Sequence, residues 1–172
     1  MNNINVKNAW RFLFLLLLQV AVFKQLNAQW AYSTYFHIFI YPIFLLLLPF
    51  RYSKIVLLLL AFGMGISVDV FYNTIGIHAS ACVFTAFVRP TILSIVKPQS
   101  DYDVLQSPNA SEYGFVWFLR YASIMLFLHL FFYFSVEAFT FVYIGQIFLK
   151  TLGSFLISIL FVILYKFIFN PK

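Results

Sequence analysis

Charge is scarce in this 172-residue chain: charged residues make up only 9% of it, whereas hydrophobic residues make up 63%. An ordinary globular chain carries about a quarter charged residues, because its surface must face water. The composition therefore excludes a water-soluble domain and indicates an integral membrane protein. The net charge of +6 is better explained by basic residues on the cytoplasmic side of a membrane than by nucleic acid, and we expect no nucleic-acid partner.

Residues that carry catalysis or bind metals are equally scarce. The single cysteine, Cys82, excludes an internal disulfide and any multi-cysteine metal site. His37, His78 and His129 lack the spacing of a helical zinc-binding pair, and three of the five acidic residues fall in one polar segment, so no carboxylate dyad is formed. No nucleophile elbow or glycine-rich phosphate loop occurs. We therefore expect no catalytic residues, no metal and no cofactor.

The long apolar runs predict an all-α, polytopic membrane protein. At about 20 residues per crossing the chain has room for five to seven spans and for no separate folded domain, so we expect a single domain over residues 1–172. A polar, turn-rich segment at 97–114 is predicted to be a loop. Six transmembrane helices are predicted, at residues 10–26, 35–50, 54–72, 78–96, 115–137 and 144–169.

The first two predicted spans have features that are unusual for a straight transmembrane helix. Pro42 lies inside the second span and is expected to kink it. The first span has a competing interpretation as a cleaved signal peptide, because Lys7 and Arg11 precede a short apolar core.

The distribution of basic residues predicts the orientation in the membrane. Only Lys24 and Lys150 fall at the ends of the spans opposite the N-terminus. The other nine lie at the ends that share a side with it: Lys7, Arg11, Arg51, Lys54, Arg89, Lys97, Arg120, Lys166 and Lys172. By the positive-inside rule both termini and the 97–114 loop are expected in the cytoplasm.

Most of the polar chemistry lies between residues 61 and 90, in two predicted helices joined by a tight turn. Small and polar residues recur there at helical spacing, which places each set on one face, away from lipid. The first helix has Ala61, Gly65, Asp69 and Asn73, and the second, after Gly76, has His78, Cys82, Thr85 and Arg89.

Depth in the membrane decides which of these groups can meet. At 1.5 Å per residue, Asp69 near the outer end and Arg89 near the inner end are too far apart to pair. We expect Asp69 to accept hydrogen bonds from Ser67, Asn73, His78 or Lys150, because an unpaired carboxylate is costly at that depth. Arg89 is expected to extend to the cytoplasmic headgroups.

Six positions are accordingly expected to have structural or coupling roles, and two others are expected to form an ion pair at the outer side. The six are Gly65, Asp69, Asn73, Gly76, His78 and Arg89, and the predicted pair is Glu137 with Lys150.

The ordered polar positions resemble the MreD family, the small rod shape-determining membrane proteins of bacteria, over essentially the whole chain. The first set of matching positions is Gly65-x3-Asp69, Gly76-x-His78-x2-Ala81 and Arg89-Pro90. The second set is Ser107-Pro108, Gly114-Phe115-x-Trp117-Phe118-x2-Tyr121 and Glu137-Ala138-Phe139, which is similar to the subgroup with a long cytoplasmic loop.

The resemblance implies a non-enzymatic scaffold of the cell-elongation machinery in the bacterial inner membrane. Its implied partners are membrane lipid, an MreC-like protein, the peptidoglycan synthases of the rod complex and, indirectly, MreB. The implied fold is similar to the substrate-binding S components of energy-coupling-factor transporters. Two alternatives stay open: a substrate-binding subunit of a vitamin transporter, and an intramembrane enzyme that uses Asp69 and His78.

Overall fold

The chain is all-helical over the part that the computed structural model describes, which comprises residues 2–29, 35–98, 102–103 and 106–169. The first helix runs without a break through three geometries, with a π-helical turn in its middle. In chain order the elements are α1 (Asn2–Leu18), η1 (Gln19–Phe23), α2 (Lys24–Gln29), α3 (Pro42–Leu46), α4 (Lys54–Tyr72), α5 (Ile77–Ile95), α6 (Ala110–Tyr113), α7 (Phe115–Ala138) and α8 (Ile144–Phe169).

Five helices of these described residues are long and apolar enough to cross a membrane: Val6–Asn27, which falls within α1, η1 and α2, and then α4, α5, α7 and α8. The prediction of a multi-pass, all-α membrane protein is therefore confirmed. The bounds of α4 and α8 are those predicted, α5 begins and ends one residue earlier than predicted, and α7 ends one residue later. The first helix extends further than predicted at both ends.

The predicted second span at 35–50 is wrong as a helix. Residues 36–40 are extended, Tyr41 has a helical conformation as the N-cap of α3, and only Pro42–Leu46 forms this short helix. The reason lies in Pro42, which has no N–H to donate to the carbonyl of Ile38 and whose ring would clash with that carbonyl in a continuous helix. The proline therefore begins a helix at its first position instead of kinking one.

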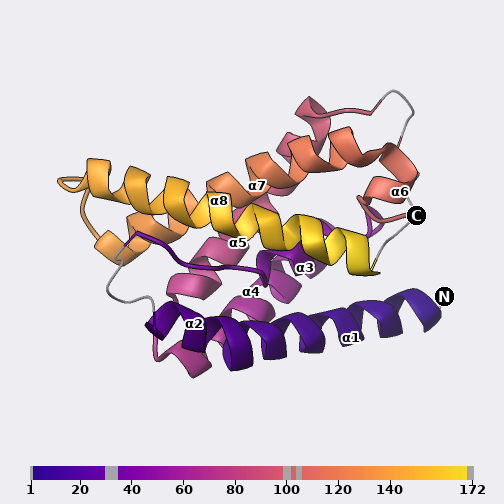
Figure 1. Cartoon of the computed structure of the whole chain (residues 1–172). Coiled ribbons are helices and arrows are strands. Elements are labelled where there is room, and N and C mark those ends of the chain that lie inside the picture. The colour runs from indigo at the N-terminus through magenta and orange to yellow at the C-terminus, as the bar shows by residue number, and fades with distance from the viewer. Residues whose placement is uncertain (1, 30–34, 99–101, 104–105, 170–172) are drawn as a thin grey trace.

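The extended segment lies in the interior of the protein. In Figure 1 it passes between α2 and α8 toward α3, while α1 and α8 run along its two sides. Ile38 and Phe39 are each only 1% exposed. α4 packs closely on α5, α5 on α7 and α7 on α8, and α3 contacts α1, α4, α5 and α7. The N- and C-terminal ends and α6 lie at the same end of the bundle (Figure 1).

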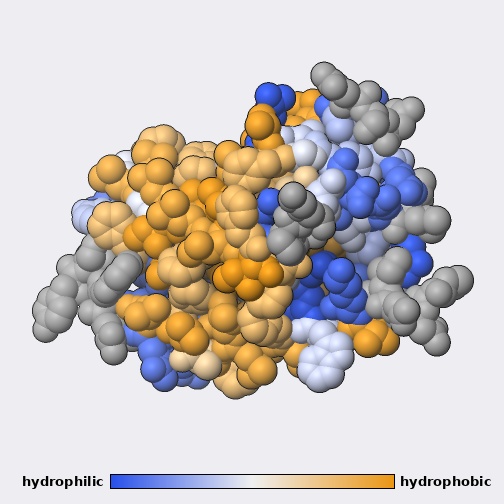
Figure 2. Space-filling model, turned by 45° about the vertical axis from the view of Figure 1, so that its right-hand side comes forward, coloured by the Kyte–Doolittle hydropathy of each residue, from blue (hydrophilic) through white to orange (hydrophobic). Residues whose placement is uncertain are grey.

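The outer surface is apolar over most of its height, as a lipid-facing surface must be. Figure 2 shows a broad hydrophobic face, with hydrophilic residues gathered toward the end that carries the termini. Large apolar side chains stand exposed along every long helix, among them Leu17, Leu59, Phe87, Val116 and Leu160.

The predicted loop 97–114 contains the one-turn helix α6, and it is tied to the bundle. The N–H of Phe50 donates to the carbonyl of Gln106 at 3.1 Å. The Tyr102 hydroxyl donates to the carbonyl of Leu93 at 2.7 Å. The two helices that the loop connects are themselves joined, because the Trp117 indole N–H of α7 donates to the carbonyl of Val96 at the end of α5 at 2.5 Å. The loop residues 99–101 and 104–105 lie outside the described residues.

Candidate functional site

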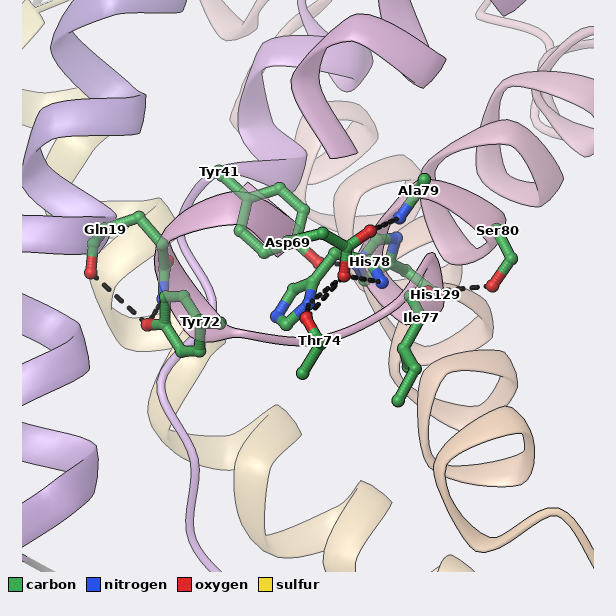
Figure 3. Close-up of polar contacts among 10 residues, drawn as sticks. All are labelled: Gln19, Tyr41, Asp69, Tyr72, Thr74, Ile77, His78, Ala79, Ser80 and His129. Atoms are coloured by element: carbon green, nitrogen blue, oxygen red, sulfur yellow. Dashed lines mark hydrogen bonds and ion pairs between the residues drawn. The ribbon is translucent and has the colours of Figure 1, made fainter. Parts of the chain in front are cut away.

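Asp69 is the centre of a buried polar cluster where α4 turns into α5 (Figure 3). Its Oδ1 accepts from the backbone N–H of His78 at 3.0 Å and from the Thr74 hydroxyl at 2.5 Å. Its Oδ2 accepts from the backbone N–H of Ala79 at 2.9 Å. These N–H groups are among the first of α5, so the carboxylate caps a helix that has no side-chain cap at Gly76 and interacts favourably with its dipole.

The turn that delivers this cap is built from Asn73 and Gly76. Both adopt left-handed conformations, with φ of 55° at Asn73 and 77° at Gly76. Such values are tolerated by asparagine and glycine and rarely by other residues. The N–H of Asn73 donates to the carbonyl of Asp69, which ends α4. The expectation that Asp69 is hydrogen-bonded at this turn is thus confirmed, with His78 as the donor among the four candidates.

His78 is held by Asp69 and enclosed by aromatic rings. Its Nδ1 lies 3.1 Å from Asp69 Oδ1, and the side chain is fully buried. The rings of Phe39, Tyr41, Tyr72 and Tyr133 lie 4.8–6.1 Å from the imidazole, centroid to centroid. Within the described part of the chain, Nε2 has no hydrogen-bond partner. The carboxylate therefore orients the ring through Nδ1.

Gly65 allows the backbones of α4 and α5 to touch beneath this cluster. A Cβ at Gly65 would lie 2.3 Å from the Ala79 Cα and 2.7 Å from the His78 carbonyl oxygen, far inside contact distance. At Gly63, two residues earlier, a Cβ would meet nothing within 4 Å. Gly65 thus serves the close approach of two helices of this chain.

His129 on α7 forms a second buried cluster that the sequence analysis did not assign. Its Nδ1 lies 2.8 Å from the Thr85 hydroxyl and its Nε2 lies 2.9 Å from the Tyr41 hydroxyl. Because Thr85 donates its proton to the Ala81 carbonyl, its oxygen accepts from His129 Nδ1–H, and Tyr41 donates to Nε2. The hydrogen-bonded chain Tyr41–His129–Thr85 therefore joins the start of α3 to α7 and α5.

We expected Arg89 to extend to the cytoplasmic headgroups, but its side chain is buried in the protein, with only 2% of it exposed. Its Nη2 donates to the carbonyl of Leu48, and its Nε donates to the Tyr121 hydroxyl at 3.1 Å. Tyr121 in turn donates to the carbonyl of Leu46 at 3.2 Å. The guanidinium thus binds the Leu48 carbonyl, two residues after α3, directly and the Leu46 carbonyl at the end of α3 through Tyr121, which offsets its burial. Asp69 and Arg89 lie in separate hydrogen-bonded clusters, as the depth argument predicted.

The extended segment is hydrogen-bonded by side chains along one edge. Gln19, at the start of η1, accepts from the N–H of Ile40 at 2.9 Å and donates to the carbonyl of Ile38 at 3.1 Å. Asn27, eight residues later, accepts from the N–H of Ile38 at 2.9 Å and donates to its carbonyl at 3.3 Å. The two amides thus replace the neighbouring strand that an extended backbone requires.

The other edge is hydrogen-bonded by two serines of α8. The Ser154 hydroxyl accepts from the N–H of His37 at 3.0 Å, and that of Ser158 accepts from the N–H of Phe39 at 2.9 Å. The serines are spaced by four and the segment residues by two, which matches one helical turn to two strand residues. Irregular backbone at membrane depth is tolerated only where protein groups satisfy it, as they do here.

The sequence analysis did not single out the four side chains that bind the extended segment, although their spacing could have indicated them. Gln19 and Asn27 are two amides in an apolar helix at a spacing of eight, and Ser154 and Ser158 share a face of the last helix. The predicted ion pair of Glu137 with Lys150 is confirmed, with the Nζ atom 3.0 Å from Oε2.

The chemistry of these clusters is hydrogen bonding of the chain's own backbone. Asp69 caps α5, Arg89 binds the end of α3, and the four side chains above hold the extended segment. No group of three or more metal-ligating side chains occurs within residues 2–29, 35–98, 102–103 and 106–169.

Comparison of the chain with protein-family models, with curated proteins and with solved structures found no match.

Proposed function

We propose that this protein is a non-enzymatic membrane scaffold of the bacterial cell-elongation complex, as its resemblance to the MreD family implies. In this proposal it lies in the inner membrane with both termini in the cytoplasm. It holds an MreC-like protein and the peptidoglycan synthases of the rod complex together, and through them it is linked to MreB.

The observation that supports a scaffold is that the buried polar side chains form hydrogen bonds with the backbone of the protein itself. Asp69 and Arg89 bind backbone groups of neighbouring elements, and Gln19 and Ser158 bind the extended segment. Groups used in this way make a rigid body, because each joins two different elements of the chain. The apolar outer faces of the long helices then remain for lipid and for the helices of other proteins.

The test is a pull-down of the tagged chain from membranes of a rod-shaped bacterium that carries the gene, solubilised in a mild detergent. We expect an MreC-like protein and a rod-complex synthase among the captured proteins, and round cells after deletion of the gene. Asp69→Asn is expected to reduce the amount of captured partner, because it loosens the start of α5. Unchanged rods after deletion, with no such partner captured, would refute the proposal.

Analysis of small molecules in the same preparation distinguishes the scaffold from the substrate-binding subunit of a transporter. A vitamin bound at about one molecule per chain, or rescue of a growth defect by that vitamin, would favour a substrate-binding subunit over a scaffold. The enzyme alternative predicts instead that Asp69→Asn abolishes a turnover while leaving the captured complex intact.

A further inference from the structure

A cavity with basic walls opens at the end of the bundle that carries the termini. It has a volume of about 370 Å³ and lies between the start of α4, the second half of α5 and the polar loop. Three of its lining residues are cations: Lys54 at the first position of α4, Arg89 on α5 and Lys97 just after α5. Aromatic and apolar side chains, among them Phe50 and Tyr102, line the rest.

The three cations sit at different depths. Lys54 and Lys97 are exposed at the rim. Arg89 lies six residues before the end of α5, which places it about 9 Å deeper along the helix at 1.5 Å per residue. The Leu48 carbonyl and the Tyr121 hydroxyl hold its guanidinium, and its Nη1 has no hydrogen bond among the described residues. The cavity therefore has a hydrogen-bonded charge at its base and two exposed charges at its mouth.

These charges are not neutralised by the acids that the structure describes. The two ion pairs found in that part of the chain are His78 with Asp69 and Lys150 with Glu137, and neither involves a cation of this cavity. Burial raises the pKa of the Tyr102 phenol, so this lining group stays protonated and uncharged. Among the described residues that line the cavity, three are cations and none is acidic, which favours an anion.

We infer that this cavity binds the phosphate group of an anionic membrane phospholipid. Basic pockets between transmembrane helices near the membrane surface have the chemistry that such headgroups require, with lysines as point charges and arginine as a planar donor. The apolar walls at Leu57, Pro90 and Leu93 suit the glycerol and the first acyl carbons.

A second hollow next to it favours a lipid over free phosphate. This groove has a volume of about 590 Å³, is almost wholly apolar and is lined by Phe12, Phe44, Val56 and Leu60. Tyr52 lines both hollows. A phosphate group in the basic cavity therefore has an apolar surface close by for its acyl chains.

The test measures binding by the purified full chain in a neutral detergent. The probes are short-chain phosphatidylglycerol, short-chain phosphatidylcholine and inorganic phosphate, and the readouts are the shift in melting temperature and the dissociation constant. The variant is Lys54→Gln with Lys97→Gln. The matched control is Lys7→Gln with Arg120→Gln, which removes the same charge from exposed residues at the same end of the bundle, outside the lining of this cavity.

We expect phosphatidylglycerol to stabilise the parent chain and phosphatidylcholine to have little effect. The cavity variant should bind phosphatidylglycerol roughly 10- to 30-fold more weakly, since each lysine near the surface contributes several-fold to binding of anionic lipid. The control should bind like the parent chain. Equal binding by the two variants, or equal effects of the two lipids, would overturn the inference. Stabilisation by inorganic phosphate as large as that by phosphatidylglycerol would overturn the lipid as its ligand.

Discussion

Asp69 shows how a single buried carboxylate can be stable in an apolar helix. Four groups converge on its two oxygens: two backbone N–H groups, the Thr74 hydroxyl and the His78 ring. A carboxylate with this many donors is satisfied without an arginine or a lysine. Its position nine and ten residues before its backbone donors makes it the link between α4 and α5.

Replacement of Asp69 by asparagine tests this link. The new amide keeps one acceptor oxygen, but its NH2 group faces backbone or hydroxyl donors, so at least one buried donor loses its partner. We expect a loss of about 1–3 kcal/mol in the free energy of unfolding, measured as a lower melting temperature in detergent. Ser94→Ala, which removes an exposed hydroxyl bonded within its own helix, should leave the melting temperature unchanged. A variant as stable as the parent chain would show that the cap contributes nothing.

Gly65 and Gly63 offer a matched pair for the close approach of α4 and α5. Gly65→Ala places a methyl group 2.3 Å from the Ala79 Cα, so the helices must move apart, whereas Gly63→Ala meets open space. We expect Gly65→Ala to destabilise the protein by about 1–3 kcal/mol or more and Gly63→Ala to be neutral or slightly stabilising. Thermal unfolding of the two variants side by side measures the difference, and equal melting temperatures would contradict the close packing.

Among the elements, the extended segment 36–40 is the one that departs most from a bundle of helices. Its backbone is hydrogen-bonded by Gln19 and Asn27 on one edge and by Ser154 and Ser158 on the other. The π-helical turn begins at Gln19. Such bulges are common where a helix presents a side chain for a special purpose, and here Gln19 binds the extended backbone.

Ser154→Ala with Ser158→Ala tests the α8 edge. The change leaves the N–H groups of His37 and Phe39 buried without acceptors, at a cost of about 1–3 kcal/mol for each. We expect faster amide hydrogen exchange at these two residues and a lower melting temperature. Ser67→Ala is the control, because that hydroxyl donates only to the Gly63 carbonyl of its own helix. Unchanged exchange at His37 and Phe39 would contradict the assigned hydrogen bonds.

The sequence predicted the five long helices because long apolar runs with clear ends are the strongest signal a membrane chain carries. Ser53 accepts from the N–H of Val56 at the start of α4, and Asn73 ends it in a left-handed conformation, so local residues fix its bounds. The extended segment was missed because its apolar composition also suits a helix, and its hydrogen-bond partners lie on other elements. Asp69 and His78 were recognised as neighbours because a short turn joins them. The contacts of Arg89 were missed because they join distant segments.

In the whole molecule, the long helices and the extended segment lie side by side, with both termini at one end (Figure 1). If the extended segment and α3 together cross the membrane once, the chain crosses it six times. The concentration of basic residues at the end with the termini then predicts that this end is cytoplasmic.

Cysteine accessibility tests this arrangement, because Cys82 is the only cysteine and is buried. In a Cys82→Ser background we expect Ile75→Cys, in the fully exposed turn between α4 and α5, to react with a membrane-impermeant maleimide added to intact cells. Ser94→Cys, near the other end of α5, should react only after the membrane is opened. The reverse pattern would overturn the predicted orientation.

The hydrogen bonds between the extended segment and α8 have a consequence for synthesis of the chain. The bonded residues are separated by 117 and 119 positions, so the segment enters the membrane long before Ser154 and Ser158 leave the ribosome. Until then the amide hydrogens of His37 and Phe39 depend on water, lipid headgroups or the insertion machinery. A nascent chain that stops before α8 should therefore remain incompletely folded and be removed by membrane proteases, even though its other long helices are already inserted.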